Sequence, residues 1–152
     1  MGLDSAALYA ALDERRAERR LSWEGLAREI GVASSTILRT RSGSAMECDG
    51  FLAMVRWLGR SAEEFAVDRP RQAAAIRPGR LDTRALHAAL ERKRLRRRLT
   101  WRMVADEMGP GVAPSMLTRL RSGGRASAGV VLRSVGWLDM SVNDFVTRRR
   151  AS

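Results

Sequence analysis

Apolar residues recur at three- and four-residue steps through most of the chain, and this spacing is typical of short amphipathic helices. In the first such stretch, Leu8 and Leu12 lie four residues apart behind Asp4, a candidate N-cap. A second helix of about two turns is expected to begin after Ser22 and to end at Gly31 in a left-handed conformation. No stretch is typical of a strand, so the pattern predicts an all-α protein.

Three more helical segments are expected before residue 66. A short connection leads from Gly31 to a third helix within residues 33–43, which Gly43 closes. Apolar residues at positions 51, 52, 55 and 58 predict a fourth helix. The sequence "SAEEF" at residues 61–65 has the form of a capping box that opens a fifth, short turn.

The chain contains this series of helices twice. The alignment pairs residues 3–31 with 81–109 and, after an insertion of Pro110 and Gly111, residues 32–65 with 112–145. These 63 pairs contain 28 identities, and all four tryptophans match, Trp23 with Trp101 and Trp57 with Trp137. Because the repeat covers a whole series of helices, each copy is expected to be one folding unit. We call residues 3–65 the first copy and residues 81–145 the second copy.

The repeat also sets the expected domain boundaries. They are a first unit at 1–66, a linker at 67–80, a second unit at 81–147 and a basic tail at 148–152. The linker has two prolines and no apolar period, although a helical turn over its alanines is an alternative. In the second copy, the residues expected to begin or end helices are Asp82, Thr100, Gly109, Pro114 and Gly123. The tail is expected to be frayed.

The stretch "LSWEGLAREIGVASSTILRTRSG" at residues 21–43 resembles the core of the phage-repressor type (Cro/C1, or Xre) helix-turn-helix family. The sequences "WLGRSAEEF" and "WLDMSVNDF" resemble the closing helices of that family. The resemblance covers residues 3–65 and 81–145. It implies two tandem five-helix, lambda-repressor-like units that bind double-stranded DNA.

The same resemblance implies that the third helix of each copy reads bases in the major groove. Ile37 and Thr40 should face the core, as should Leu117 and Leu120. The outward residues that would contact bases are Ser34, Ser35 and Arg39 in the first copy and Pro114, Ser115, Thr118 and Arg119 in the second. The two arginines are the strongest candidates, because a guanidinium can bind guanine O6 and N7 through two hydrogen bonds.

Phosphate contacts are expected at the start of the second helix and in the turn after the third. The residues are Trp23, Arg41, Ser42 and Gly43 in the first copy and Trp101, Arg121, Ser122, Gly123 and Arg125 in the second. In these turns, arginine charge would combine with free backbone N–H groups.

Three features depart from the family pattern. Tryptophan stands where the family often has a phosphate-binding glutamine at the start of the second helix, and its indole offers only one donor. Arg16 and Arg41 would meet as like charges where the family tends to pair Arg with Glu, and so would Arg94 and Arg121. Ala33 and its counterpart Ala113 lack a capping side chain, which weakens the third helix start by about 1 kcal/mol.

The net charge of +11 favours a polyanionic partner, either nucleic acid or an acidic membrane surface. The charge is unevenly distributed, because residues 1–70 hold 10 arginines against 11 acidic residues, whereas residues 71–152 hold 18 basic residues against 6 acidic ones. An alternative is therefore that the first unit is a protein-interaction or homodimerisation module and that only the second binds nucleic acid. The basic run at 91–99 could be a solvated helix face or could contact phosphate or RNA.

Other chemistry has little support in the sequence. Cys48 and His87 are the only residues of their types, so no enzyme activity, metal site or cofactor is expected. Cys48 is expected to be small and buried, and His87, which aligns with Tyr9, partly exposed. Trp57 and Trp137 are expected to anchor the core, whereas Trp23 and Trp101 could pack or face DNA. The chain has no apolar run of membrane-spanning length and no signal peptide, which favours a cytoplasmic, nucleoid-associated protein.

Overall fold

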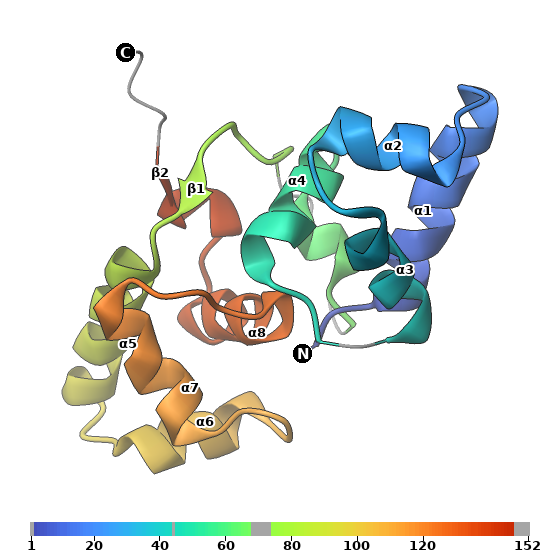
Figure 1. The fold of residues 1–152 in the computed structure, drawn as a ribbon. Helices are drawn as coiled ribbons and strands as arrows, with labels where there is room; N and C mark the ends of the chain where they lie inside the picture. Colours follow the sequence, from blue (N-terminus) through green and yellow to red (C-terminus); the bar gives the residue numbers. More distant parts are fainter. Residues whose placement is uncertain (1, 44, 68–73, 148–152) are drawn as a thin grey trace.

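The computed structural model of the chain describes residues 2–43, 45–67 and 74–147, and within these residues the fold is almost entirely helical (Figure 1). The first copy contains α1 (Ser5–Glu18), α2 (Trp23–Ile30), α3 (Ser34–Ser42), α4 (Cys48–Leu58) and the 3-10 helix η1 (Ala62–Phe65). The second contains α5 (Thr83–Arg96), α6 (Trp101–Met108), α7 (Pro114–Thr118), the 3-10 helix η2 (Arg119–Ser122), α8 (Ala128–Leu138) and the 3-10 helix η3 (Val142–Phe145). The all-α prediction is confirmed at this level.

The predicted caps begin the helices of both copies. An Asp4 carboxylate oxygen accepts a hydrogen bond from the Ala7 N–H at 3.0 Å, and Asp82 caps α5 in the same way. The side chains of Ser22 and Thr100 accept from backbone N–H groups at the starts of α2 and α6. Each cap satisfies a donor that the helix itself leaves without a partner. Local sequence therefore decides where these four helices begin.

Each copy is closed by pairing the residues before its first helix with those after its last. The strands β1 (Arg80–Leu81) and β2 (Val146–Thr147) pair antiparallel, and an isolated bridge joins Leu3 to Ala66 at the equivalent place. The expectation that the chain has no strand was therefore wrong. Two residues are too few to show the alternation by which a strand is recognised in sequence.

The inward residues of both copies belong to one hydrophobic cluster. Leu8, Leu12 and Leu26 are 0% exposed, and so are their counterparts Leu86, Leu90 and Val104. Ile76, from the segment between the copies, is also buried in the cluster at 5% exposure. Of the predicted linker, residues 67 and 74–80 are described, and Ile76 joins the second of these stretches to the core.

The two copies meet through α4 and α8 in a reciprocal arrangement. The Cys48 N–H donates to the Ala126 carbonyl at 2.7 Å, and the Ala128 N–H donates to the Met46 carbonyl at 2.8 Å. In the repeat, position 46 corresponds to 126 and position 48 to 128, so each copy gives the other the contact that it receives. This is the pattern of a two-fold symmetric dimer interface, here formed within one chain.

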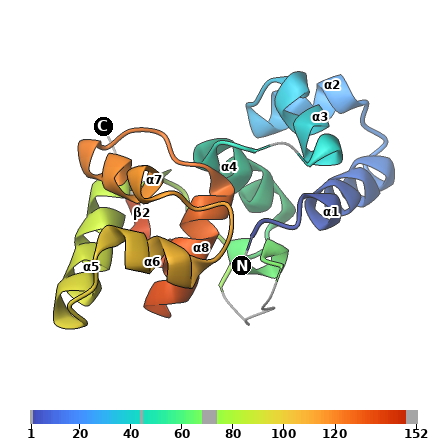
Figure 2. The same ribbon diagram turned by 90° about the horizontal axis from the view of Figure 1, so that it is seen from below.

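The figures show the same relation between the copies. In Figure 1, α1 and α5 lie at opposite ends of the molecule, with α4 and α8 between them. The helices α3 and α7 both lie on the near side of that view, and both lie in the upper half of Figure 2. The pseudo-two-fold relation therefore presents α3 and α7 on one side of the protein.

Side chains at the repeated position 63/143 strengthen the junction of the copies. A Glu63 carboxylate oxygen accepts hydrogen bonds from the Val142 N–H at 2.7 Å and from the Ser141 hydroxyl at 3.1 Å. The Asn143 side chain accepts from the Arg77 N–H and donates to the Ala75 carbonyl, both at 3.0 Å. These bonds hold η3 and the linker in place.

Two local predictions in this region were wrong. The Ser61 side chain makes no capping bond, so "SAEEF" is not a capping box, whereas Ser141 and Asp144 form one in the second copy. Ala74 and Ala75 are not helical, and Ala73 lies outside the described residues together with the tail 148–152. The Asn143 side chain donates to the Ala74 and Ala75 carbonyls, so contact with the second copy holds this part of the linker.

Candidate nucleic-acid interface

The helix α3 and, in the second copy, α7 together with the following η2 bury one face and expose the other. Their inward residues are almost completely buried: Ile37, Thr40, Leu117 and Leu120, each at 2% exposure or less. Ala33 and Ala113 make no side-chain capping bond, as expected. The proposed base-contact residues exposed on the other face are Ser34, Ser35, Arg39, Ser115, Thr118 and Arg119. Pro114 is half-buried at the first position of α7, where its missing N–H costs no hydrogen bond.

The two exposed helices differ in regularity. The helix α3 runs unbroken for nine residues, whereas α7 has five and continues as η2. The connection into α7 also differs, because Gly109 has φ 100° and ψ −179° and is not the left-handed helix end that was expected. Pro110 follows it, and a residue before proline is pushed towards extended ψ values. The insertion therefore changes how the chain enters α7.

The turns after these helices use several of the donors that were predicted to bind phosphate. The Ser42 and Ser122 hydroxyls donate to the Arg39 and Arg119 carbonyls at 3.0 and 2.8 Å. The Gly123 N–H donates to the Leu120 carbonyl at 3.2 Å, so the expectation of a free N–H there was wrong. The exposed charge of these turns comes from Arg41, Arg121 and Arg125.

Trp23 and Trp101 connect the first two helices of each copy. Trp23 stacks on Tyr9 with ring centroids 5.1 Å apart, and Trp101 stacks on His87 at 5.2 Å. The guanidinium of Arg16 lies 4.6 Å from the Trp23 ring centroid, and Arg94 has the same place over Trp101. The indole faces are thus engaged inside each copy, so a phosphate could be bound only through the indole N–H.

In each pair of arginines that the family pattern brings together, one arginine is held by other partners. Arg16 donates to the Leu21 carbonyl at 2.8 Å and to Asp13 at 2.6 Å, while Arg41 remains exposed. Arg94 donates to the Leu99 carbonyl at 3.0 Å in the same way. One arginine of each pair therefore secures the connection between two helices and leaves the other at the surface.

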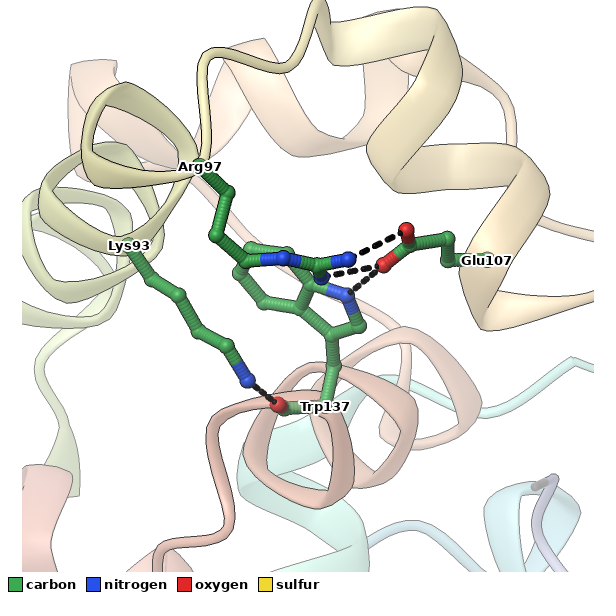
Figure 3. Close-up of polar contacts among 4 residues, drawn as sticks. All are labelled: Lys93, Arg97, Glu107 and Trp137. Carbon is green, nitrogen blue, oxygen red and sulfur yellow. Dashed lines mark hydrogen bonds and ion pairs between the residues drawn. The ribbon is translucent and has the colours of Figure 1, made fainter.

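Trp57 and Trp137 pack against the core as expected, but both are only half-buried and also use their indole N–H groups. The Trp137 N–H donates to Glu107 at 2.7 Å, and Arg97 binds the same carboxylate through two hydrogen bonds at 2.6 and 2.9 Å (Figure 3). The first copy repeats this network with Arg19, Glu29 and Trp57. The sequence signal that could have predicted this network is that all three residues are identical in the two copies.

The electrostatics of this network are mutually stabilising. The hydrogen bond from Arg97 lowers the pKa of the Glu107 carboxyl, with a further contribution from the Trp137 N–H. The same hydrogen bond raises the pKa of Arg97. Lys93 also donates to the Trp137 carbonyl and lies 4.5 Å from the Trp137 ring centroid (Figure 3). The network fixes the positions of α5, α6 and α8 around the exposed α7.

The basic run at 91–99 is divided by these contacts. Three of its six basic side chains bind within the protein, namely Lys93, Arg94 and Arg97. The remaining three are exposed: Arg92, Arg96 and Arg98. The run is therefore not a fully solvated face, and a phosphate or RNA contact through its three exposed arginines stays a prediction.

The lone histidine and cysteine are structural residues. His87 is 7% exposed, so the expectation of a partly exposed residue was wrong, and burial is the main cause that lowers its pKa. Cys48 is buried at the start of α4 as predicted, and burial, followed by Asp49 and Glu47, raises its pKa. A buried thiol with a raised pKa is a poor nucleophile.

Comparison of the chain with family models, with curated proteins and with solved structures found no match. Within the described residues, no helix is long and apolar enough to cross a membrane. Those residues also contain no cluster of three or more metal-ligating side chains.

Proposed function

We propose that the chain is a non-enzymatic, sequence-specific DNA-binding regulator built from two tandem five-helix helix-turn-helix units. The units are lambda-repressor-like in the order of their helices, and α3 and α7 are their recognition helices. Arg39 and Arg119 would read guanine, while the exposed arginines of the following turns would bind phosphate. No cofactor is required by this proposal.

The reciprocal contact between the copies is the observation that best supports the proposal. Separate helix-turn-helix subunits usually dimerise to meet two half-sites about 34 to 36 Å apart along DNA. Here the bonds between Cys48 and Ala126 and between Ala128 and Met46 join the copies as two subunits of a dimer would be joined. One chain would therefore meet two half-sites.

The pseudo-two-fold relation also favours a particular orientation of the half-sites. Two readers related by a two-fold axis require half-sites in inverted order, whereas readers related by translation require direct repeats. The side chains at the starts of α3 and α7 differ, with Ser34 and Ser35 in the first and Pro114 and Ser115 in the second. We therefore expect an imperfect inverted repeat with two unequal halves.

Selection of binding sites from random duplex DNA tests this function. The expected motif has two inverted halves with centres about 10 base pairs apart. A motif of one half-site would contradict the use of both copies, and a direct repeat would contradict the pseudo-two-fold arrangement. Failure to enrich any sequence would reject sequence-specific binding altogether.

Matched substitutions show which copy reads which half of the motif. Arg39→Ala should relax base preference in one half and Arg119→Ala in the other, each by about 1 to 3 kcal/mol. Arg28→Ala is a suitable control, because Arg28 is exposed on α2 and is outside the proposed contact set. Loss of preference at both halves after either substitution would contradict independent readers.

A second function is favoured by the charge asymmetry between the halves of the sequence. In this alternative the first copy binds a protein or a second chain, and only the second copy binds nucleic acid. Arg41→Ala and Arg121→Ala in the full chain separate the two cases through the salt dependence of binding. Each lost phosphate contact should lower the log–log salt slope by about 0.9. An effect of Arg121→Ala alone would support the second function, and equal effects would reject it.

A further inference from the structure

Two exposed helix faces at opposite ends of the molecule carry opposite charge at equivalent positions. Glu14 and Glu18 lie on α1, and the repeat places Arg92 and Arg96 at the same positions of α5. All four side chains are exposed, and none makes a hydrogen bond or ion pair within the described part of the chain. The faces are equivalent in the repeat and complementary in charge. The helices that carry them lie at opposite ends of the molecule (Figure 1).

Within each helix these two charges have the same sign and repel each other. Residues four apart on a helix are neighbours, so Glu14 repels Glu18 and Arg92 repels Arg96 by a few tenths of a kcal/mol. The two glutamates also lie in the second half of α1, where the helix dipole disfavours negative charge. Their arrangement is therefore not explained by contacts within the chain.

The second helices provide an instructive contrast. Position 24/102 also reverses charge between the copies, from Glu24 to Arg102, and position 28/106 reverses from Arg28 to Asp106. There each helix keeps one charge of each sign four residues apart, so the two side chains can attract each other within the helix, more favourably in α2, where the acidic residue comes first, than in α6. On α1 and α5 the opposite charges are instead separated onto different ends of the molecule.

The α5 end also has a shape that could receive another helix. A surface hollow of about 580 Å³ is lined by Arg92, Arg96, Leu95, Met140, Ala89 and Leu138. Leu95 is 59% exposed and Met140 is 38% exposed, so two large apolar side chains are available at this hollow. The equivalent of Leu95 on the α1 face is the small, exposed Ala17. A large residue on one face therefore corresponds to a small residue on the other.

We infer that the α5 face is a docking surface for the α1 face of a second copy of this chain. In the contact, Glu14 and Glu18 of one molecule pair with Arg92 and Arg96 of the next, and Leu95 packs over Ala17. Because each molecule has one face of each kind, the contact is head-to-tail, and each molecule can bind two neighbours. This association is independent of the proposed DNA binding, so it is tested without nucleic acid.

Sedimentation equilibrium of the full chain at about 50 mM salt measures the association directly. The weight-average mass of the natural protein should rise with concentration, and the rise should disappear at about 500 mM salt. E14R/E18R and R92E/R96E should each weaken association at least tenfold, because each variant has two faces of the same sign. An equimolar mixture of the two variants should associate again, because every contact then joins opposite charges.

The mixture also excludes misfolding as the cause of any loss, since misfolded variants would not restore each other. E24R/D106R is the matched control, because it raises net charge as much as E14R/E18R does but leaves both faces unchanged. A natural protein that stays monomeric overturns the inference, as does a mixture that fails to associate. If the protein does not self-associate and R92E/R96E weakens binding to duplex DNA or RNA, the α5 face binds nucleic-acid phosphate and the inference is wrong.

Discussion

The first and second copies share their framework and differ in the surface that they present. Both use the same arginine, glutamate and tryptophan network, and both stack a helix α2 or α6 tryptophan on an aromatic ring of the preceding helix. The helix exposed at the surface is continuous in the first copy and interrupted in the second. The difference teaches that residues with contacts inside each copy are the ones that both copies keep. In the second copy the exposed helix follows the insertion of Pro110 and Gly111 and is interrupted.

The largest expected effect comes from truncating an equivalent core leucine in each copy. Leu12→Ala and Leu90→Ala should each lower the free energy of unfolding by about 2 to 5 kcal/mol, because both side chains are 0% exposed. Both variants should unfold in one transition, since the copies share a core and an interface. Urea denaturation followed by tryptophan fluorescence measures both quantities.

Leu38→Ala is the control for these core variants, because Leu38 is 51% exposed and its truncation should change stability by less than about 0.5 kcal/mol. Two separate transitions in either core variant would show that the copies fold independently. That result would contradict the shared core as the source of cooperativity.

Position 63/143 tests the junction of the copies. Glu63→Ala should leave the buried Val142 N–H without its acceptor, and Asn143→Ala should do the same to the Arg77 N–H. We expect each to cost about 1 to 3 kcal/mol, measured by thermal or urea unfolding. Glu64→Ala removes an exposed ion pair with Arg60 and should cost less than about 1 kcal/mol. Similar losses of unfolding free energy in all three variants would show that the bonds at the junction contribute no more than a surface ion pair does.

His87 and Tyr9 occupy equivalent positions in the two copies, and only His87 should make the stability depend on pH near neutrality. Burial lowers the pKa of His87 in the folded protein, so the unfolded chain binds the proton more readily. Stability should therefore fall as the pH drops below the ordinary histidine value of about 6.5, by at most about 1.4 kcal/mol per pH unit. His87→Tyr should remove this component, as seen in unfolding midpoints at pH 7.5 and 5.5. An identical pH response in both proteins would count against a buried neutral histidine.

The smallest expected effects concern a backbone feature that both copies share. Arg20 and Arg98 each have φ 54°, a left-handed conformation that glycine adopts without a side-chain penalty. Arg20→Gly and Arg98→Gly should each raise stability by a few tenths to about 1 kcal/mol, in thermal unfolding. Arg15→Gly, within α1, should instead lower it by about 1 kcal/mol. Unequal effects at 20 and 98 would show that the turns are not equivalent.

Sequence reasoning predicted the features that depend on neighbouring residues. Helix starts at Asp4 and Ser22 follow from local capping, and the buried face of α3 follows from helical spacing at Ile37 and Thr40. The bonds of Ser42 and Ser122 to carbonyls three residues earlier are also local, and known serine behaviour would have allowed their prediction. The exposed side of the candidate interface was thus largely predictable.

Features that depend on distant residues were missed. Trp57 and Glu29 are 28 residues apart, and Glu63 and Val142 are 79 apart, so no local pattern indicates either contact. The burial of His87 depends on the stacking of Trp101 from the next helix. The conformation of Gly109 was missed because the alignment with Gly31 did not take the following proline into account.

The reciprocal bonds between Cys48 and Ala126 and between Ala128 and Met46 mean that each chain already contains its own partner. A regulator made of two separate subunits loses its paired form on dilution, and occupancy of its site then falls with the square of protein concentration. A paired form that is covalently continuous cannot be diluted apart. In the proposed DNA binding, occupancy would instead follow the first power of concentration, so a cell with few molecules would retain a graded response.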